Sequence, residues 1–123
     1  TRLSSDLLSA DERRTLVPAL EGLETLFPER VNAGFARVLP GVERTLELHV
    51  FERGAGWTQA CGTGACAAAA AAMETGRLDR TGPIVVRLPG GERAIDLGAP
   101  GERAWMTGPA RRVFAGTTET RRP

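Results

Sequence analysis

One short segment of the chain gathers residue types that can do chemistry. A carboxylate (Glu52), a guanidinium (Arg53) and a thiol (Cys61) lie within ten residues, and a glycine-rich turn follows the thiol. We expect a strand, a loop, the cysteine, a glycine turn and a helix in that order. Cys61 then lies directly before a helix N-terminus, where backbone N–H groups lack partners inside the helix. Such a position favours a negatively charged sulfur and can bind a carboxylate or a phosphate.

The glycines after the cysteine have a functional and a steric explanation. Gly62 and Gly64 allow the backbone to approach a ligand closely, and Thr63 adds a hydroxyl and an N–H donor. The steric needs of a strand-to-helix turn would account for the same two glycines. A phosphate-binding loop is a weak alternative, because the lysine that follows glycine in the P-loop signature is absent.

The chain has two cysteines, Cys61 and Cys66, and one histidine, His49. The cysteines are separated by a helix start, and a metal site would need further ligands close by. We therefore expect neither a disulfide nor a metal site. Cys66 lies among alanines, and we interpret it as a small core residue.

The elements that must position this segment can be inferred from periodicity. A helix is predicted over residues 5–26, from leucines at three- and four-residue spacing, with Ser9 as a capping residue. Pro18 should lie near its start or at a kink. A second helix is predicted over 65–75 from a run of alanines, with Gly76 as its C-cap.

The remaining segments alternate or carry turn signals, as strands do. We predict strands over 31–38, 46–51, 84–88 and 93–97, a flexible loop over 52–56, and a final strand pair over 104–107 and 110–114. The predicted class is α+β: a mostly antiparallel sheet curled around a central alanine-rich helix.

Size and charge exclude several classes of protein. The chain has 123 residues, enough for one domain with its own core, and we treat 1–123 as that domain. Sixteen basic and fifteen acidic side chains are spread along it, without the basic stripe of a nucleic-acid-binding protein. No apolar run is long enough for a membrane span or has the layout of a signal peptide. We expect a cytoplasmic protein, and the first residue, Thr1, suggests a processed, trimmed or partial chain.

The reactive segment resembles the second catalytic-cysteine motif of diaminopimelate epimerases. The likeness lies in Glu-Arg-Gly-Ala-Gly at 52–56 and Ala-Cys-Gly-Thr-Gly-Ala at 60–65. Further matches occur in the same order: Phe-Pro-Glu-Arg-Val-Asn at 27–32, Leu-Pro-Gly-Gly at 88–91, Met-Thr-Gly-Pro-Ala at 106–110 and Val-Phe at 113–114.

The resemblance implies an enzyme that interconverts L,L- and meso-diaminopimelate without pyridoxal phosphate or any other cofactor. This step belongs to bacterial lysine and cell-wall precursor synthesis. Such enzymes have two similar domains with the substrate between them, so this chain would be the C-terminal one. It would need the N-terminal domain for activity, and a homodimer is also compatible with the resemblance. No nucleic-acid or membrane partner is implied.

The resemblance also assigns roles to individual residues. Cys61 would be one of the two acid/base thiols, with Glu52 pairing with it and holding the substrate amino group. Arg53 would be a substrate-contacting cation. Gly62 and Thr63 would anchor the carboxylate at the reacting centre through helix N-terminal donors. The substrate's distal amino-acid end would contact Asn32.

Two features depart from the family pattern. Trp57 stands where the family usually has glutamate, and we expect it to alter loop packing or the cleft rim rather than proton transfer. The first-domain cysteine motif and an Asn-Pro-His segment are absent. A catalytically inactive domain or binding module therefore remains an alternative. A related racemase or isomerase of the same fold, such as a proline racemase or a phenazine-pathway isomerase, is another.

Overall fold

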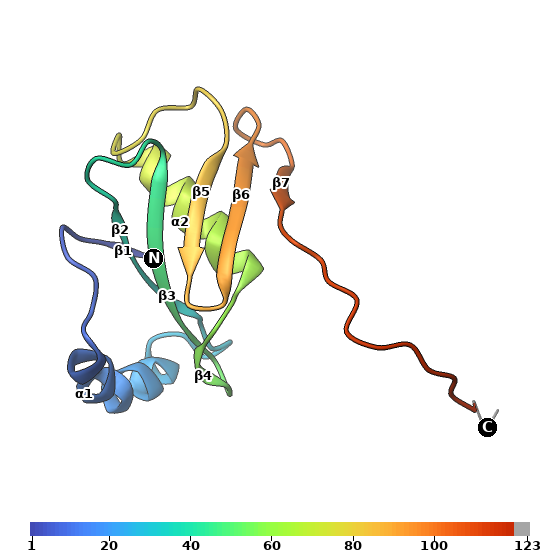
Figure 1. The fold of residues 1–123 in the computed structure, drawn as a ribbon. Helices are drawn as coiled ribbons and strands as arrows, with labels where there is room; N and C mark the ends of the chain where they lie inside the picture. The colour runs from blue at the N-terminus through green and yellow to red at the C-terminus, as the bar shows by residue number, and fades with distance from the viewer. Residues whose placement is uncertain (120–123) are drawn as a thin grey trace.

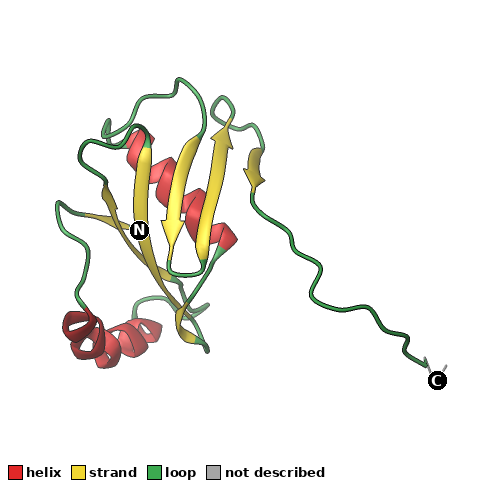
Figure 2. Cartoon of the chain, in the orientation of Figure 1, coloured by secondary structure: helices red, strands yellow, loops and turns green. Residues whose placement is uncertain are grey.

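The computed structural model describes residues 1–119. A mixed sheet is accompanied by two α-helices and a short 3-10 helix (Figures 1 and 2). The strand order is β1-β2-β3-β5-β6-β7, and β4 pairs with β3. The elements are β1 (Arg2–Leu3), α1 (Ala10–Glu21), η1 (Gly22–Thr25), β2 (Ala33–Val38), β3 (Thr45–Glu52), β4 (Gly56–Thr58), α2 (Gly62–Glu74), β5 (Ile84–Leu88), β6 (Gly91–Leu97) and β7 (Ala104–Thr107).

The long strand β3 organises the sheet because its side chains alternate between the two faces. Leu46, Leu48 and Val50 are at most 1% exposed and belong to the core beneath α2. His49 and Phe51 point to the opposite face, which α1 approaches. Each face of β3 therefore carries a different helix.

The helix α2 forms because alanine has the highest helix propensity and its small side chain permits close packing. Ala65, Ala68, Ala69 and Ala72 recur at helical spacing, and each is 0% exposed. In Figure 1, α2 crosses one face of the sheet behind β5 and β6. The C-cap of α2 is Thr75, one residue before the predicted Gly76. Gly76 follows it with a left-handed φ of 67°, which ends the helix.

The connection through α2 explains why the sheet is mixed. A helix that links two neighbouring strands returns the chain in the same direction, so β5 pairs parallel with β3. β1 also pairs parallel with β2, whereas the other strand pairs are antiparallel. The sheet was predicted to be mostly antiparallel. Most of the strand pairs are antiparallel, and the two parallel pairs were not predicted.

The first helix is shorter than predicted. It begins at Ala10, because Ser9 and Glu12 form a capping box in which each side chain binds the other's backbone N–H. It ends at Glu21 and continues as η1, and Pro18 lies inside it. No residue of α1 is buried, so α1 adds little to the core.

The C-terminal strand prediction was half wrong. β7 forms as expected over Ala104–Thr107, but residues 110–114 make no strand. They belong to an extended segment that leaves the body of the protein (Figure 1). Two short strands, β1 and β4, were not predicted, because two or three residues are too few to show a periodicity.

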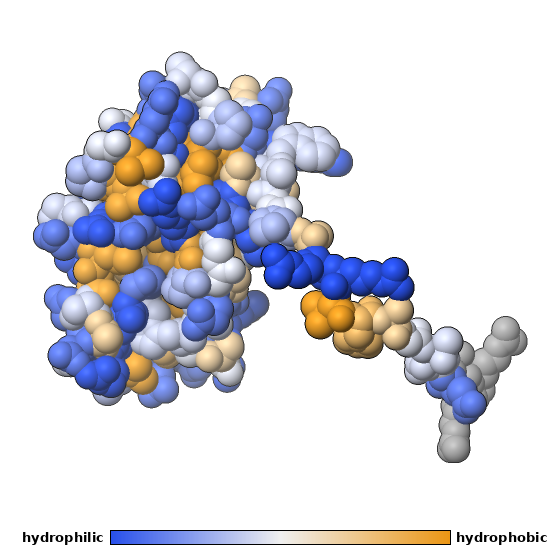
Figure 3. Space-filling view, viewed as in Figure 1, coloured by the Kyte–Doolittle hydropathy of each residue, from blue (hydrophilic) through white to orange (hydrophobic). Residues whose placement is uncertain are grey.

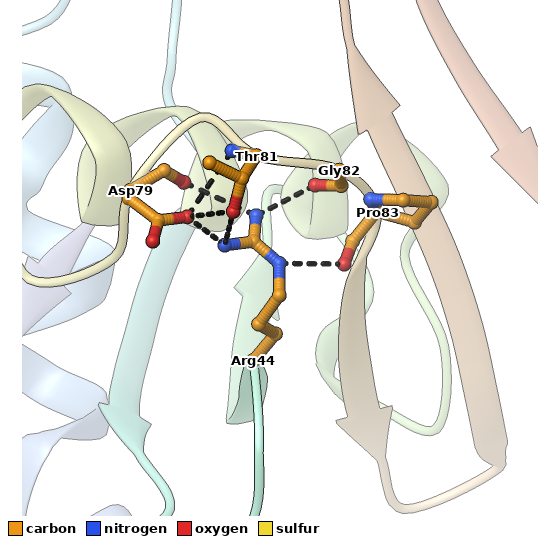
Figure 4. Close-up of polar contacts among 5 residues, drawn as sticks. All are labelled: Arg44, Asp79, Thr81, Gly82 and Pro83. Atoms are coloured by element: carbon orange, nitrogen blue, oxygen red, sulfur yellow. Dashed lines mark hydrogen bonds and ion pairs between the residues drawn. The ribbon is translucent and has the colours of Figure 1, made fainter.

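Arg44 fastens the α2–β5 loop to the start of β3 (Figure 4). Its guanidinium donates hydrogen bonds to the carbonyl oxygens of Asp79 (3.1 Å), Gly82 (2.6 Å) and Pro83 (3.1 Å), and it pairs with the Asp79 carboxylate. The Arg44 backbone has a φ of 46°, a left-handed conformation that costs energy for a non-glycine residue. These contacts fix the loop that brings β5 beside β3.

Candidate functional site

Cys61 is the N-cap residue of α2. Its backbone is extended (φ −143°, ψ 107°), and its sulfur accepts a hydrogen bond from the Gly64 N–H at 3.4 Å. The Thr63 hydroxyl lies 3.6 Å from the same sulfur. A cysteine therefore occupies the capping position that serine, threonine, aspartate or asparagine usually fill. This arrangement puts the sulfur at the positive end of the helix dipole.

Cys61 and Glu52 line one open hollow of about 620 Å³. Cys61 is 6% exposed, whereas Glu52 is half-buried. The hollow thus combines a thiol, a carboxylate and the N-terminus of α2. Its lining residues are Glu52, Ala60, Cys61, Gly62, Thr63, Cys66, Ala104 and Met106.

Four of the six predicted site residues meet at this hollow, and two do not. Arg53 follows the last residue of β3, so it turns away from the face that carries Glu52. Its guanidinium donates to the Glu29 carbonyl oxygen at 2.8 Å and lines a separate cavity of about 440 Å³ beside α1. The Asn32 side-chain oxygen accepts the Arg53 backbone N–H at 3.0 Å. Asn32 therefore holds the β3–β4 hairpin in this structure.

The two glycines that follow the thiol differ in steric need. A Cβ atom on Gly64 would lie 3.1 Å from the Cys61 sulfur and 3.0 Å from the Val50 side chain, both of which are buried. A Cβ atom on Gly62 would lie 3.0 Å from the end of the flexible, exposed Met106 side chain, which can move aside. Steric need therefore explains Gly64 better than Gly62, and the lack of side chains leaves the backbone of both open toward the hollow.

The loop that delivers Cys61 is fixed by a neighbouring turn. β5 occupies the edge of β3 near Thr45–Glu47, and β4 occupies the same edge near Val50. Between them, the Gly90 N–H of the β5–β6 turn donates to the Gln59 carbonyl oxygen at 2.7 Å. Because β5 and its turn occupy the edge of β3 beyond β4, the chain leaves the sheet after Gln59, and α2 begins at Gly62.

The predicted loop 52–56 is a tight hairpin rather than a flexible loop. Glu52 is the last residue of β3, Gly56 is the first of β4, and the two are paired in register. Gly54 and Gly56 both have a φ of 75°, a left-handed conformation that favours glycine. The hairpin brings Thr58 next to Glu52, and the Thr58 hydroxyl donates to Glu52 Oε1 at 2.6 Å. Thr58 was not among the predicted site residues, although the register of a hairpin over 52–56 places it beside Glu52.

Trp57 packs on the opposite face of the hairpin from the hollow. Its ring contacts Phe51 edge-on at a centroid distance of 5.4 Å and Phe35 at 5.7 Å. The indole N–H donates to the Arg13 carbonyl oxygen in α1 at 3.1 Å. This residue therefore joins α1 to the sheet, and it does not line the hollow that contains Cys61.

Cys61 and Cys66 are both free thiols. Cys66 packs against the core, as predicted, but it also lines the hollow. Burial raises the pKa of the Cys66 thiol. Across residues 1–119, no group of three or more His, Cys, Asp or Glu side chains could hold a metal ion. None of the described helices is both long enough and apolar enough to pass through a membrane.

Comparison with known proteins places this chain in a family. The sequence profile of diaminopimelate epimerase matches residues 5–113. Over 90 residues the chain is 54% identical to the diaminopimelate epimerases of Stutzerimonas stutzeri and Pseudomonas entomophila, covering 73% of this chain and 31% of each relative. Over 102 residues it is 51% identical to that of Ectopseudomonas mendocina, covering 83% of this chain and 35% of the relative.

The chain thus spans about a third of the length of the curated relatives it matches. Its fold resembles that of a phenazine biosynthesis protein of the PhzF family from Bacillus anthracis, with a TM-score of 0.56 and 17% identity. That match covers 85% of this chain and 32% of the other, and it concerns the fold alone. By its sequence profile and its curated relatives, the chain belongs to the diaminopimelate epimerase family.

Proposed function

We propose that this chain supplies one of the two acid/base thiols of a diaminopimelate epimerase that works without pyridoxal phosphate. The observation that carries the proposal is the shared hollow, in which the Cys61 thiol and the Glu52 carboxylate meet at the N-terminus of α2. Inversion of a carbon centre by proton transfer needs an acid on one face and a base on the other. One thiol meets half of that requirement.

The backbone around Cys61 suits a substrate that carries a carboxylate. The Gly64 N–H is taken by the Cys61 sulfur, and the Ala65 N–H by the Cys61 carbonyl oxygen. The N–H groups of Gly62 and Thr63 have no partner within α2. They would bind the carboxylate next to the reacting carbon, where they also stabilise charge that develops when the proton leaves.

Cys61 would then exchange the α-proton on one face of the substrate. In the thiolate form it accepts the proton from the α-carbon, and in the thiol form it returns a proton to that carbon. Glu52 would pair with the thiol and bind the substrate ammonium group. Arg53 would contact the substrate as a cation, and Asn32 would contact its distal amino-acid end.

The second thiol would come from an N-terminal domain, with which this chain forms the C-terminal half of a two-domain enzyme. Exposed apolar side chains support such a partner: Trp105 on β7 is 70% exposed, and Val113 and Phe114 are 86% and 85% exposed. Figure 3 shows apolar atoms on the extended segment, away from the body. We propose that the partner domain covers them, and that in the assembled enzyme the sheet curls around α2. A homodimer and a cytoplasmic location complete the proposal.

A second candidate is a catalytically inactive domain. It is favoured by the position of Arg53 and Asn32, which contact Glu29 and the hairpin backbone, so that the predicted substrate contacts are not assembled around the thiol. The two candidates differ in one measurable property, the exchange of the substrate α-proton.

Deuterium incorporation at the α-carbon of L,L- and meso-diaminopimelate tests the proposal. It should be measured with this chain alone, and then with the N-terminal part of the Stutzerimonas stutzeri relative added. We expect inversion only with both parts, and a loss of about 10²- to 10⁴-fold in Cys61→Ala. Circular dichroism and a melting curve should confirm that the variant folds. Absence of exchange in folded, reduced protein with both parts present would favour the catalytically inactive domain.

A further inference from the structure

Thr58 contacts Glu52, the carboxylate that the proposed reaction needs beside Cys61. Its hydroxyl donates a 2.6 Å hydrogen bond to Glu52 Oε1. Among residues 1–119, no other hydrogen bond reaches this carboxylate, and no arginine forms an ion pair with it. Arg53, its neighbour in sequence, donates to the Glu29 carbonyl oxygen. The orientation of the Glu52 carboxylate therefore depends on one hydroxyl group.

The β3–β4 hairpin brings the two residues together by its register. Glu52 is opposite Gly56, and Val50 is opposite Thr58. Residues that differ by two positions in a strand share a face, so Thr58 lies diagonally across from Glu52 on the face toward α2. Gly56 has no side chain that could intervene. Both Thr58 and Glu52 are half-buried, which limits competition from water for their hydrogen bond.

We propose that Thr58 is a positioning residue that holds Glu52 in the orientation needed for proton exchange at Cys61; this inference rests on the function proposed above. The hydroxyl fixes one carboxylate oxygen, Oε1, so that Oε2 has a defined direction for the thiol and the substrate ammonium group. Without the hydroxyl, the Glu52 side chain is free to rotate among its rotamers. A smaller fraction of substrate complexes would then have the carboxylate in place.

The first test compares three variants in the α-proton exchange assay, with both parts of the enzyme present. Thr58→Val keeps the branched shape and removes the hydroxyl, and it should lower kcat by about 10- to 100-fold with a smaller change in KM. Thr58→Ser keeps the hydroxyl and should restore most of the rate. Thr75→Val is the matched control, because the Thr75 hydroxyl bonds the Ala71 carbonyl oxygen (2.7 Å) at the other end of α2. The Thr75→Val variant should exchange the substrate α-proton at the rate of the unmodified chain.

A double-mutant comparison separates positioning of Glu52 from a general effect on structure. If Thr58 acts through Glu52, Thr58→Val should cost little more in a chain that already carries Glu52→Gln. Independent costs that multiply in the double variant would overturn the inference. A rate in Thr58→Val equal to that of the unmodified chain would overturn it too, while leaving the proposed epimerase function intact.

A measurement without turnover keeps the inference testable if the protein proves inactive. In a chain labelled with ¹³C in its glutamate carboxyl carbons, the Glu52 resonance can be assigned by its loss in Glu52→Gln. This resonance should move in Thr58→Val and return toward its original position in Thr58→Ser. An unmoved resonance in Thr58→Val refutes the inference. Absence of exchange in every form, with a resonance that does move, refutes the proposed function and supports the contact between Thr58 and Glu52.

Discussion

At the scale of single residues, neighbours in the sequence can serve different sites. Glu52 ends β3 on the face toward α2 and lines the hollow with Cys61. Arg53 begins the hairpin turn and lines the cavity beside α1. Successive residues of a strand point to opposite faces of the sheet. Adjacent Glu and Arg residues therefore need not contact the same ligand. The substrate contacts predicted for Arg53 stay a prediction.

Trp57 shows how a departure from a family pattern can be tested. Replacing it with the usual glutamate, Trp57→Glu, removes its contacts with Phe35 and Phe51 and its hydrogen bond to Arg13. We expect a loss of about 2–4 kcal/mol in the free energy of unfolding of the isolated chain, measured by urea denaturation. Phe114→Glu is the control, because Phe114 is 85% exposed and lies outside the helices and strands, and it should change stability by less than about 0.5 kcal/mol.

The same variant also tests the assignment of the hollow. Trp57 does not line the hollow that contains Cys61, so proton exchange in the presence of the partner domain should continue near its unmodified rate. A sharply higher epimerase rate in Trp57→Glu would contradict this expectation. It would mean that the family glutamate takes part in the reaction from the other face of the hairpin.

At the scale of elements, the position of the thiol depends on three segments, of which the β5–β6 turn is distant from it in the sequence. β4 brings the chain to Gln59, the β5–β6 turn holds it there through Gly90, and α2 begins at Gly62. A Cβ atom on Gly90 would lie 2.9 Å from the Gln59 carbonyl oxygen, so no larger residue fits without a shift of backbone. The position of Cys61 thus depends on the β3–β5 pairing that the α2–β5 loop makes possible.

Arg44 offers a test of that loop. Arg44→Met removes the hydrogen bonds to the carbonyl oxygens of Gly82 and Pro83, and we expect the free energy of unfolding to fall by about 2–3 kcal/mol. Urea denaturation of the isolated chain measures it. Arg87→Met is the matched control, because Arg87 pairs with Glu92 at an exposed site, and its loss should cost less than about 1 kcal/mol. Equal costs for the two variants would show that Arg44 does not brace the loop.

At the scale of the whole molecule, the helices on the two faces of the sheet differ in how many buried side chains they contribute. α2 buries four alanines against the core, whereas α1 has no buried residue. Polar contacts join α1 to the sheet: Arg13 Nη1 lies 2.6 Å from His49 Nδ1, and the Trp57 indole binds the Arg13 carbonyl oxygen. The Arg13 guanidinium can only donate hydrogen bonds, so His49 Nδ1 must be unprotonated to accept this one.

This contact predicts a pH dependence of stability. Burial and, to a lesser degree, the Arg13 charge lower the pKa of His49 below its usual 6.5. Between that value and the lower folded one, the unfolded chain binds more protons than the folded chain, so stability falls as the pH decreases. Urea denaturation at pH 7.5 and pH 5.5 should show the loss, and His49→Gln should reduce it. An identical loss in His49→Gln would assign the effect to other groups.

Much of the architecture was accessible from local pattern. The alanine run predicted α2 almost to its ends, the alternation at 46–51 predicted the core of β3, and Ser9 marked the start of α1. The sequence also placed Cys61 just before a helix N-terminus. The predicted glycine turn at 62–64 was wrong, because these residues form the first turn of α2 and make Cys61 its N-cap. These features depend on interactions within a few residues, which the order of side chains determines directly.

Contacts between distant segments were decided only by the tertiary structure. The predicted strand at 110–114 has the right composition but no neighbouring strand, and a strand without a partner leaves its backbone hydrogen bonds unmade. The turn at Gly90 that holds Gln59 and the Thr58 hydroxyl that holds Glu52 depend on strand register. Strand register is set by which side chains of a strand pack into the core. It can therefore be assigned only when the packing on both faces of the sheet is known.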